Sequence, residues 1–467
     1  EQSGMTFISL EYVVLFLLTF VLYSFSPMSW RKPLLLVASC VFISYYHWMF
    51  LVAAVAVSLF TYGAGIAVER GLRGRHPSAV YWSSVVALVV IWLGSRYAAK
   101  VTGDHALIFP LGMSFYTFQA LSYLTEVYWE EQKAERNVMD FLLYMLLFMK
   151  FLSGPIERPG SLLPQLHKLK PATYRQMTYG MKLVLVGLVL KVVLSENISA
   201  NVDDVFNNMR SASGAQLLMA CLLYPIDMYG DFAGYTSMAI GFAAMFGLRL
   251  SPNFNRPFIS TSTSDFWRRW HISLSSWVRD YLYLPLAGEF RHWGRWGVSL
   301  SLLITFVVLG IWHGAGWNFV VYGLIQGLVI IFEQNTLEVR RKIKERVGNV
   351  VFSTYSILRT YIIFALSLVF FKCPTLADAC YFISHISLHV NQSWKEINLG
   401  MRDHTCIVAG VALVLVLIYE YFMDRVDLLS KLSARPAWQR WTLYYLLALA
   451  IFVCGKFGNE TFIYLQF

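Results

Sequence analysis

The amino-acid sequence predicts an all-α protein that crosses a membrane many times. Of its 467 residues, 57% are hydrophobic and only 14% are charged, and the mean hydropathy is +0.53. Soluble globular proteins carry about 25% charged residues. Apolar runs of roughly 20 residues, the length that spans a bilayer as a helix, occur along the whole chain. These observations predict 11 or more transmembrane segments, some of them re-entrant.

The candidate spans follow one another with mostly short polar connections. The first run, FISLEYVVLFLLTFVLYSF, has neither a basic start nor a small-residue cleavage site, so we interpret it as a retained span and not as a signal peptide. The apolar runs fall near residues 7–26, 33–48, 49–68, 79–97, 107–125, 138–152, 176–194, 214–230, 233–247, 297–312, 316–333, 351–371, 405–422 and 441–455. No repeat period or low-complexity tract divides them, so we expect one membrane domain over residues 1–467.

The net charge of +10 comes mainly from short basic connections between the spans. If the first helix runs from outside to inside, the basic clusters at 31–32, 69–76 and 130–137 all lie in the cytoplasm, as the positive-inside rule requires. Such short clusters between spans favour the lipid bilayer as a partner and not nucleic acid. The six cysteines are scattered without metal-ligand spacing, so we expect no metal site.

The longest polar interruption, 249–296, contains an amphipathic stretch at 264–281, SDFWRRWHISLSSWVRDY. At helical spacing one face carries Phe266, Trp270, Leu274, Trp277 and Tyr281, and the opposite face carries Arg268, Arg269, Ser276, Arg279 and Asp280. His271 falls at the border between them. Ser262 followed by Asp265 suits a helix start. This helix either anchors the protein at the membrane surface or dips into the protein.

The stretch GIWHGAGWNF, 310–319, places an ionisable ring inside an apolar run. A histidine within a membrane is unfavourable unless it is paired or faces a wet cavity, which favours a functional role. Neutral imidazole is well suited to accept a proton near pH 7. The glycines around His313 permit close approach of another backbone or a ligand, and Trp312 and Trp317 supply flat walls. The alternative is a core histidine that hydrogen-bonds to a neighbouring carbonyl.

A second polar group, YPIDMYGDFAGY at 224–235, puts Asp227 and Asp231 four residues apart on one helix face. They either orient a base, bind an ion, or tie helices together as structural carboxylates. The runs 108–124 and 151–159 add proline, glycine and polar residues within or beside spans. No GxSxG, Walker, HExxH or Rossmann motif is present, which argues against a soluble-type hydrolase, an ATP-driven pump and a zinc enzyme.

These motifs resemble, in order, those of the membrane-bound O-acyltransferase family. The resemblance is carried by FPLGMSFYTFQALSYLTEVY, AERNVMDFLLYMLLFMKFLSGPIERP, YGDFAGYTSMAIGFAAMFG, NFNRPFISTSTSDFWRRWHISLSSWVRDYLYLPL and GIWHGAGWNFVVYGLIQG. It is strongest over 107–330, the expected catalytic core, and is closest to the branch with alginate O-acetyltransferases and the teichoic-acid D-alanyl transferase. It implies a ring of tilted helices around a central funnel open to the cytoplasm, in a bacterial inner membrane.

The resemblance also assigns residues. The family's W-H-G histidine falls on His313, and the histidine of its W-R-R-W-H-I-S-L-S motif falls on His271; both are expected to be catalytic. The aspartate of its D-F-[SA]-G-Y motif falls on Asp231. The residues expected to support the site or line its tunnel are Asp231, Trp270, Trp312, Trp317 and Asn318.

The implied reaction is acyl transfer, most simply of acetyl, from acetyl-CoA or an acyl-carrier thioester to a hydroxyl of a cell-surface polysaccharide. No permanently bound cofactor is expected. The side chains of Arg268, Arg269 and Arg279 are candidates for attracting the anionic donor, or alternatively for anchoring the helix to anionic lipid.

The C-terminal tail, 456–467, is predicted outside the membrane. Its sequence GNETFIYLQF resembles an aromatic motif in which a central tyrosine is proposed to carry the acyl group, so Tyr464 is a candidate acyl relay; its alternative is an interfacial aromatic. A periplasmic or extracellular acyltransferase- or esterase-like partner is expected. The rival functions are D-alanyl transfer to a cell-wall polymer, acylation of a lipid or sterol and, in a different class, a flippase for lipid-linked sugars.

Overall fold

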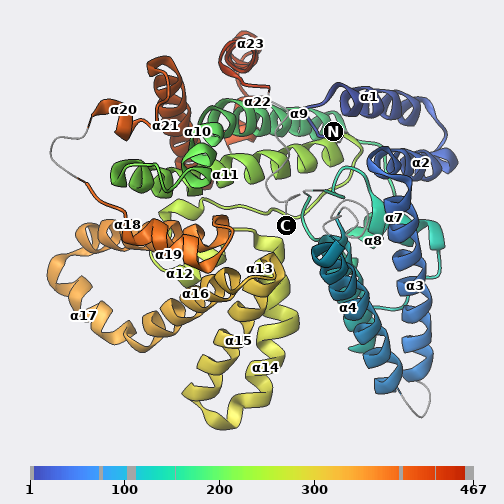
Figure 1. Ribbon diagram of the computed structural model, residues 1–467. Helices are drawn as coiled ribbons and strands as arrows, with labels where there is room; N and C mark the ends of the chain where they lie inside the picture. The colour runs from blue at the N-terminus through green and yellow to red at the C-terminus, as the bar shows by residue number, and fades with distance from the viewer. Residues whose placement is uncertain are drawn as a thin grey trace. The chain divides into compact units, whose positions relative to one another are not determined.

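The computed structural model describes residues 5–72, 77–102, 112–152, 154–388, 393–425 and 428–457 (Figure 1). All regular secondary structure in these ranges is helical, which confirms the predicted all-α class. Among the described residues, seven helical stretches are long and apolar enough to cross a membrane: Trp48–Leu72, Ser78–Arg96, Tyr174–Asn207, Arg295–His313, Trp317–Asn335, Asn349–Lys372 and Asp403–Phe422. The predicted number of 11 or more also counted shorter runs. Two of these fold as the 16-residue helix α1 and the nine-residue helix α7.

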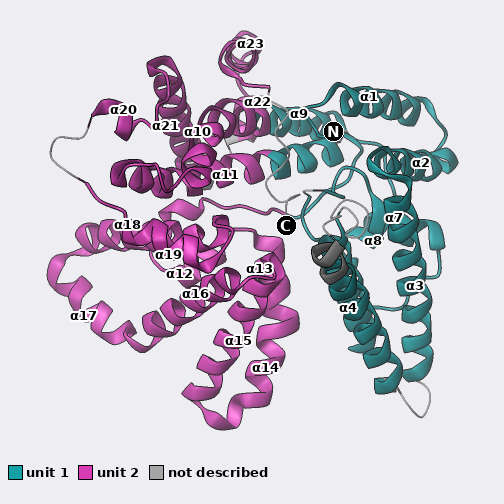
Figure 2. Ribbon diagram, viewed as in Figure 1, with its two compact units in different colours: residues 1–186, 235–251, 459–466 teal, residues 187–234, 252–458, 467 magenta. Residues whose placement is uncertain are grey.

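The chain forms two compact units, drawn in teal and magenta in Figure 2. Unit 1 holds residues 1–186 and 235–251, and unit 2 holds residues 187–234 and 252–458. The division falls inside helices α9 (Tyr174–Leu188) and α11 (Gly214–Met245). The single membrane domain expected from the sequence stays a prediction.

Unit 1 is built from the N-terminal helices. They are α1 (Leu10–Phe25), α2 (Met28–Tyr46), α3 (Trp48–Leu72), α4 (Pro77–Thr102), α6 (Met113–Tyr128), α7 (Val138–Leu146) and α8 (Pro159–His167), with most of α9 and the end of α11. Aromatic rings fill its core. The ring centroid of Tyr12 lies 5.8 Å from that of Phe42 and 6.0 Å from that of Phe148. The ring centroids of Phe16 and Phe246 are 5.6 Å apart. Buried aromatic rings in edge-to-face or tilted pairs stabilise such a core beyond the area that they bury.

Unit 2 carries the segments with the predicted functional residues. In chain order they are the π-helical turn η1 (Val189–Ser195), α10 (Glu196–Asn207), most of α11, η2 (Pro257–Ile259), α12 (Thr263–Trp267), α13 (Ile272–Val278), the π-helical turn η3 (Arg279–Tyr283), α14 (Leu284–Glu289), η4 (Phe290–Trp293), α15 (Arg295–His313), α16 (Trp317–Asn335), α17 (Leu337–Val347), α18 (Asn349–Lys372), α19 (Leu376–Ser384), α20 (Trp394–Ile397), α21 (Asp403–Arg425), α22 (Leu428–Ser433) and α23 (Ala437–Cys454). Figure 1 shows α15 and α16 joined by a short turn.

Two local expectations differ from the structure. The hydropathy pattern predicts two segments at 214–230 and 233–247, but these residues belong to the single helix α11, which continues through Pro225. The apolar spacing predicts one helix over 264–281, but the helix is broken between α12 and α13, where His271 adopts a left-handed φ of 44°. Periodicity misses this break because the apolar spacing persists across it: Phe266, Trp270, Leu274 and Trp277 are all buried.

Candidate active site

His313 is the last residue of α15, and its side chain is buried, with 3% of its surface exposed. Three aromatic rings surround the imidazole: its centroid lies 4.5 Å from that of Trp312, 5.0 Å from Phe371 and 6.0 Å from Tyr322. Aromatic walls hold the ring in one orientation and lower the local dielectric around it, which strengthens any hydrogen bond or charge interaction that it makes. The predicted wall residue Trp312 is therefore placed at the histidine.

Glycines explain why α15 and α16 pack so closely beneath His313. A Cβ built on Gly310 would overlap the carbonyl oxygen of Phe319, and one built on Gly323 would overlap the carbonyl oxygen of Phe306. A Cβ on Gly314 would collide with the ring of Phe319. The small residues of GIWHGAGW thus bring the two helices into backbone contact, the use that small residues have in membrane helix packing.

The turn after His313 is held by Asn318, which is 1% exposed. Its Nδ2 donates to the carbonyl oxygens of Phe370 at 3.1 Å and Cys373 at 2.9 Å, at the end of α18. Because these are the orphan carbonyls of a helix end, Asn318 caps α18 while fixing the first turn of α16. The other tryptophan of the motif, Trp317, is 76% exposed and is not brought into this buried group.

His271 lies between α12 and α13 and is 1% exposed. The centroid of its ring is 4.6 Å from that of Phe232 on α11, edge to face. A non-glycine residue in the left-handed region stores about 1–3 kcal/mol of strain and persists only where the surroundings enforce it. Burial lowers the pKa of His271, which lies outside the seven candidate spans, to about 3, so the ring is neutral at physiological pH.

The extended segment before η2 enforces the backbone of His271. The backbone N–H of Ile272 donates to the carbonyl oxygen of Asn253 at 2.8 Å, and the side-chain oxygen of Asn253 accepts from the Ser273 N–H at 3.1 Å and hydroxyl at 2.8 Å. On the other side, the Asn255 N–H donates to the carbonyl oxygen of Arg269 at 2.9 Å. These bonds pin both flanks of His271. Trp270, a predicted supporting residue, packs beside it at 2% exposure.

Asp231 is fully buried in α11, next to the phenylalanine that contacts His271. Lys191, in the π-turn η1, places its Nζ 2.6 Å from Asp231 Oδ1 and 2.5 Å from Glu196 Oε1. All three side chains are at most 3% exposed. The π-turn is a common feature of functional sites, and here it turns the lysine toward two carboxylates at once.

Asp227, one turn earlier on α11, accepts a hydrogen bond from the Ser195 hydroxyl at 2.6 Å. Gly230 and Gly234 permit this packing, because a Cβ on either would press on the backbone of the η1 region. Sequence reasoning placed the two aspartates on one face but missed Lys191, Glu196 and Ser195. The signal available was a lysine inside the apolar run LVLKVVL, a residue that membrane segments retain only with a partner.

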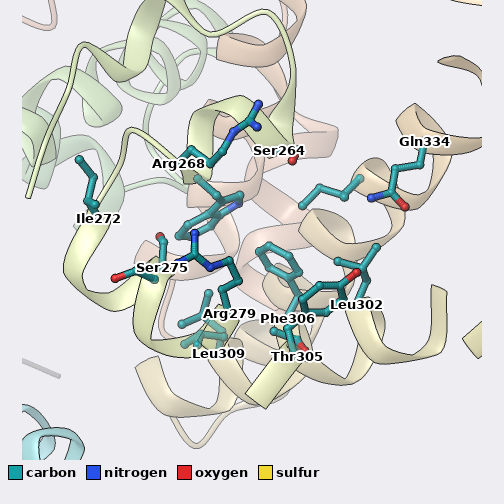
Figure 3. A pocket seen from close by; sticks show the side chains of 15 residues that line it. Ser264, Arg268, Ile272, Ser275, Arg279, Leu302, Thr305, Phe306, Leu309 and Gln334 are labelled. Carbon is teal, nitrogen blue, oxygen red and sulfur yellow. The ribbon is translucent and has the colours of Figure 1, made fainter. Parts of the chain in front are cut away.

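A pocket of about 440 Å³ opens beside the segment that carries His271 (Figure 3). Its apolar wall comes from α15, with Leu302, Phe306 and Leu309. The facing side carries Arg268 and Arg279, whose side chains are 70% and 59% exposed. Its described lining residues do not include His313 or His271. An apolar pocket with two cations suits an amphiphile that has an anionic group.

The third predicted donor-binding residue, Arg269, is used differently. Its Nε donates to both oxygens of Asp265 at 3.1 Å, and only 24% of its side chain is exposed.

The predicted helix start is confirmed, since the Ser262 hydroxyl accepts from the Asp265 N–H at 3.1 Å. Tyr464 and the C-terminal tail beyond residue 457 lie outside the described residues. Within the described part of the chain, no group of three or more metal-ligating side chains is assembled.

The sequence of this chain is similar to those of several known proteins. A family model, described as the membrane-bound O-acyltransferase family, matches residues 35–371. A probable alginate O-acetylase of Azotobacter vinelandii is 35% identical over 349 residues, which cover 71% of this chain and 69% of the relative. A peptidoglycan O-acetyltransferase of Helicobacter pylori is 28% identical, with coverages of 77% and 75%. A teichoic acid D-alanyltransferase of Bacillus subtilis is 27% identical, with coverages of 59% and 74%.

Proposed function

The chain belongs to the membrane-bound O-acyltransferase family, and we propose that it moves an acetyl group from a cytoplasmic thioester to a hydroxyl of a cell-surface polysaccharide. It is an O-acyltransferase and an integral membrane protein, as the family match over 35–371 and the seven apolar helices require. The observation that carries the proposal is His313, an imidazole buried among aromatic rings at the end of a membrane helix. We place the protein in a bacterial inner membrane.

In the proposed reaction His313 is the general base. It removes the proton of the acceptor hydroxyl while the oxygen attacks the thioester carbonyl carbon. The C–S bond then breaks, the new C–O ester bond remains, and the thiolate leaves with the proton that His313 returns. Base catalysis from a positioned side chain contributes about 100- to 10,000-fold to the rate.

The oxyanion of the tetrahedral intermediate needs hydrogen-bond donors. We assign this contribution to His271, whose lowered pKa keeps it neutral, so that one ring nitrogen carries a hydrogen and donates without adding charge. The fixed backbone around Asn253 supports that role because it holds the ring in one place. Asp231, through Lys191, is a positioning residue for the wall of α11 against which His271 packs.

The donor is proposed to reach the site beside α12 and α13. Arg268 and Arg279 line the pocket there and remain open to solvent, so they are suited to attract the phosphates of CoA or an acidic carrier protein. All three arginines are paired with an aspartate, but Arg269 is less suited because only 24% of its side chain is exposed, against 70% for Arg268 and 59% for Arg279. The apolar wall from α15 matches the uncharged part of a pantetheine thioester.

On the acceptor side, Tyr464 is proposed to receive the acetyl group and to pass it to an outer-face partner that resembles an acyltransferase or esterase. The phenol oxygen would form the ester that His313 helps to make, and the partner would transfer the acetyl group to the polysaccharide. A Tyr464→Phe variant tests this step: turnover to polymer stops, while donor binding is retained.

D-alanyl transfer is the second candidate, supported by the similarity to the teichoic acid D-alanyltransferase. The relatives named for O-acetylation cover more of the chain, 71% and 77% against 59%, which favours acetyl. The two are separated by incubating full-length protein in lipid nanodiscs with radiolabelled acetyl-CoA or with a D-alanyl carrier protein. Label transfer from the carrier protein alone would reject the acetyl assignment.

A further inference from the structure

Helix α17 (Leu337–Val347) is held at the membrane face by the spans on both sides. Thr336 alone separates it from α16, and Gly348 alone separates it from α18. Both neighbours are long and apolar enough to cross a membrane. Because each connection is a single residue, α17 cannot leave the face from which the two spans emerge.

One side of α17 is apolar and uncovered. Val339, Ile343 and Val347 follow one another at four-residue intervals, so they form one stripe along the helix. Their exposed fractions are 58%, 45% and 46%. An apolar stripe this open is unfavourable in water, but it is the face by which an amphipathic helix enters the boundary between headgroups and acyl chains.

The charges of α17 are sorted by sign around that stripe. With 3.6 residues per turn, Arg340 and Lys344 border the stripe on one side, and Lys342 and Arg346 border it on the other. The acidic residues Glu338 and Glu345 project on the far side of the helix, where Arg341 lies 3.7 Å from Glu345. Anionic groups thus meet only basic neighbours if they approach beside the stripe.

We propose that α17 lies in the plane of the membrane and binds anionic phospholipid. Val339, Ile343 and Val347 enter the acyl boundary, and the flanking basic side chains contact lipid phosphates. An acidic soluble protein would meet the charges, but it would leave the apolar stripe in water. Basic residues near an anionic surface each strengthen binding by roughly fivefold.

Amide hydrogen exchange on the full-length protein tests this proposal. Nanodiscs of phosphatidylcholine are compared with nanodiscs in which phosphatidylglycerol is titrated in. We expect exchange in 337–347 to slow with the phosphatidylglycerol fraction, and the effect to weaken as salt rises. At a given phosphatidylglycerol fraction, the variant K342Q/R346Q should show a roughly 25-fold smaller equilibrium constant for the protected state. Arg340 is left unchanged, because its Nη2 also donates to the carbonyl oxygen of Thr261 at 3.2 Å.

The matched control is E338Q/E345Q, which removes two charges from the far face of the same helix. It should keep the wild-type response to phosphatidylglycerol. Unchanged exchange in α15 verifies that each variant is folded. An exchange rate in 337–347 that does not change with the phosphatidylglycerol fraction would overturn the proposal. So would an equal loss of protection in both double variants, or protection of 337–347 by an acidic carrier protein in pure phosphatidylcholine.

Discussion

Gln326 and Glu333 lie two turns apart on one face of α16, and each accepts a hydrogen bond from the short helix α12. The indole Nε1 of Trp267 donates to Gln326 Oε1 at 3.0 Å, and the backbone N–H of Thr263 donates to Glu333 Oε2 at 2.9 Å. A five-residue helix is too short to be stable alone. The α16 face therefore fixes α12 and, through it, the segment that continues to His271.

Glu333→Gln tests this attachment. Glutamine still accepts from Thr263, but Arg359, whose Nη2 donates to Glu333 Oε1 at 2.5 Å, loses its carboxylate. Breaking a buried ion pair on one side costs about 3–5 kcal/mol, and the 19% exposure of Arg359 reduces this to about 1–3 kcal/mol. We expect a lower apparent melting temperature in detergent and a lower transfer rate. The double variant E333Q/R359Q should recover part of the lost melting temperature and transfer rate. If its losses equal the sum of those of E333Q and R359Q, the two residues are not coupled.

Lys191→Met tests the buried triad. The variant leaves the carboxylates of Glu196 and Asp231 facing each other without their cation, at a site where all three groups are at most 3% exposed. Loss of one partner of such a group costs about 3–5 kcal/mol. We expect little folded K191M protein on size-exclusion chromatography and clear recovery in K191M/D231N. Lys168→Met, at an exposed position, is the control and should behave as wild type. Normal yield and stability of K191M would contradict the assigned pairing.

Gly323→Ala tests the close packing of α15 and α16. The added methyl group would overlap the backbone carbonyl of Phe306, which cannot move aside as a side chain can. Overpacking of this kind costs about 1–3 kcal/mol, and the displaced helices would also misplace His313. Gly63→Ala, on α3, meets nothing within 4 Å and should be neutral or slightly stabilising. The two apparent melting temperatures, measured side by side, are the readout; equal values would reject backbone contact between the helices.

His271 predicts a specific pH dependence of stability. Its folded pKa of about 3 lies below the ordinary value of 6.5, so the native state resists protonation while the unfolded chain accepts a proton. Its contribution is therefore fully present above pH 6.5 and is lost as the pH falls toward 3. When the pH falls from 7.5 to 5.5, the free energy of unfolding of wild type should fall by about 1 kcal/mol more than that of His271→Asn. Parallel melting curves of the two proteins at both pH values provide the measurement, and a constant difference would contradict a buried, neutral imidazole.

Much of the fold and part of the site follow from local sequence. Composition gives the membrane class, and the pair of Ser262 and Asp265 gives a helix start because capping depends on neighbours in sequence. The glycines around His313 likewise predict close packing of the two helices. The left-handed break at His271 could not be read this way, because Asn253, about 20 residues earlier, enforces it.

The partners of Lys191 illustrate the same limit. The lysine could be expected to have a partner, but Asp231 lies 40 residues away, and the π-turn that brings the two together has no sequence signature. The 76% exposure of Trp317 could not be predicted for a related reason. The direction of α16 after the turn at 314–316 is set by the hydrogen bonds of Asn318 to the end of α18. Hydrophobic periodicity along the sequence carries no information about such distant contacts.

The role of His313 as the base for acyl transfer is tested by replacing the imidazole and measuring the transfer rate. Full-length wild type, His313→Gln and His313→Ala are reconstituted in nanodiscs, verified as folded by their melting temperatures, and assayed for transfer of radiolabelled acetyl from acetyl-CoA to protein and polysaccharide. Both variants should lose about 100- to 10,000-fold in transfer rate while they bind the donor as wild type does, because only base catalysis is removed. Folded variants that transfer acetyl at the wild-type rate would contradict it.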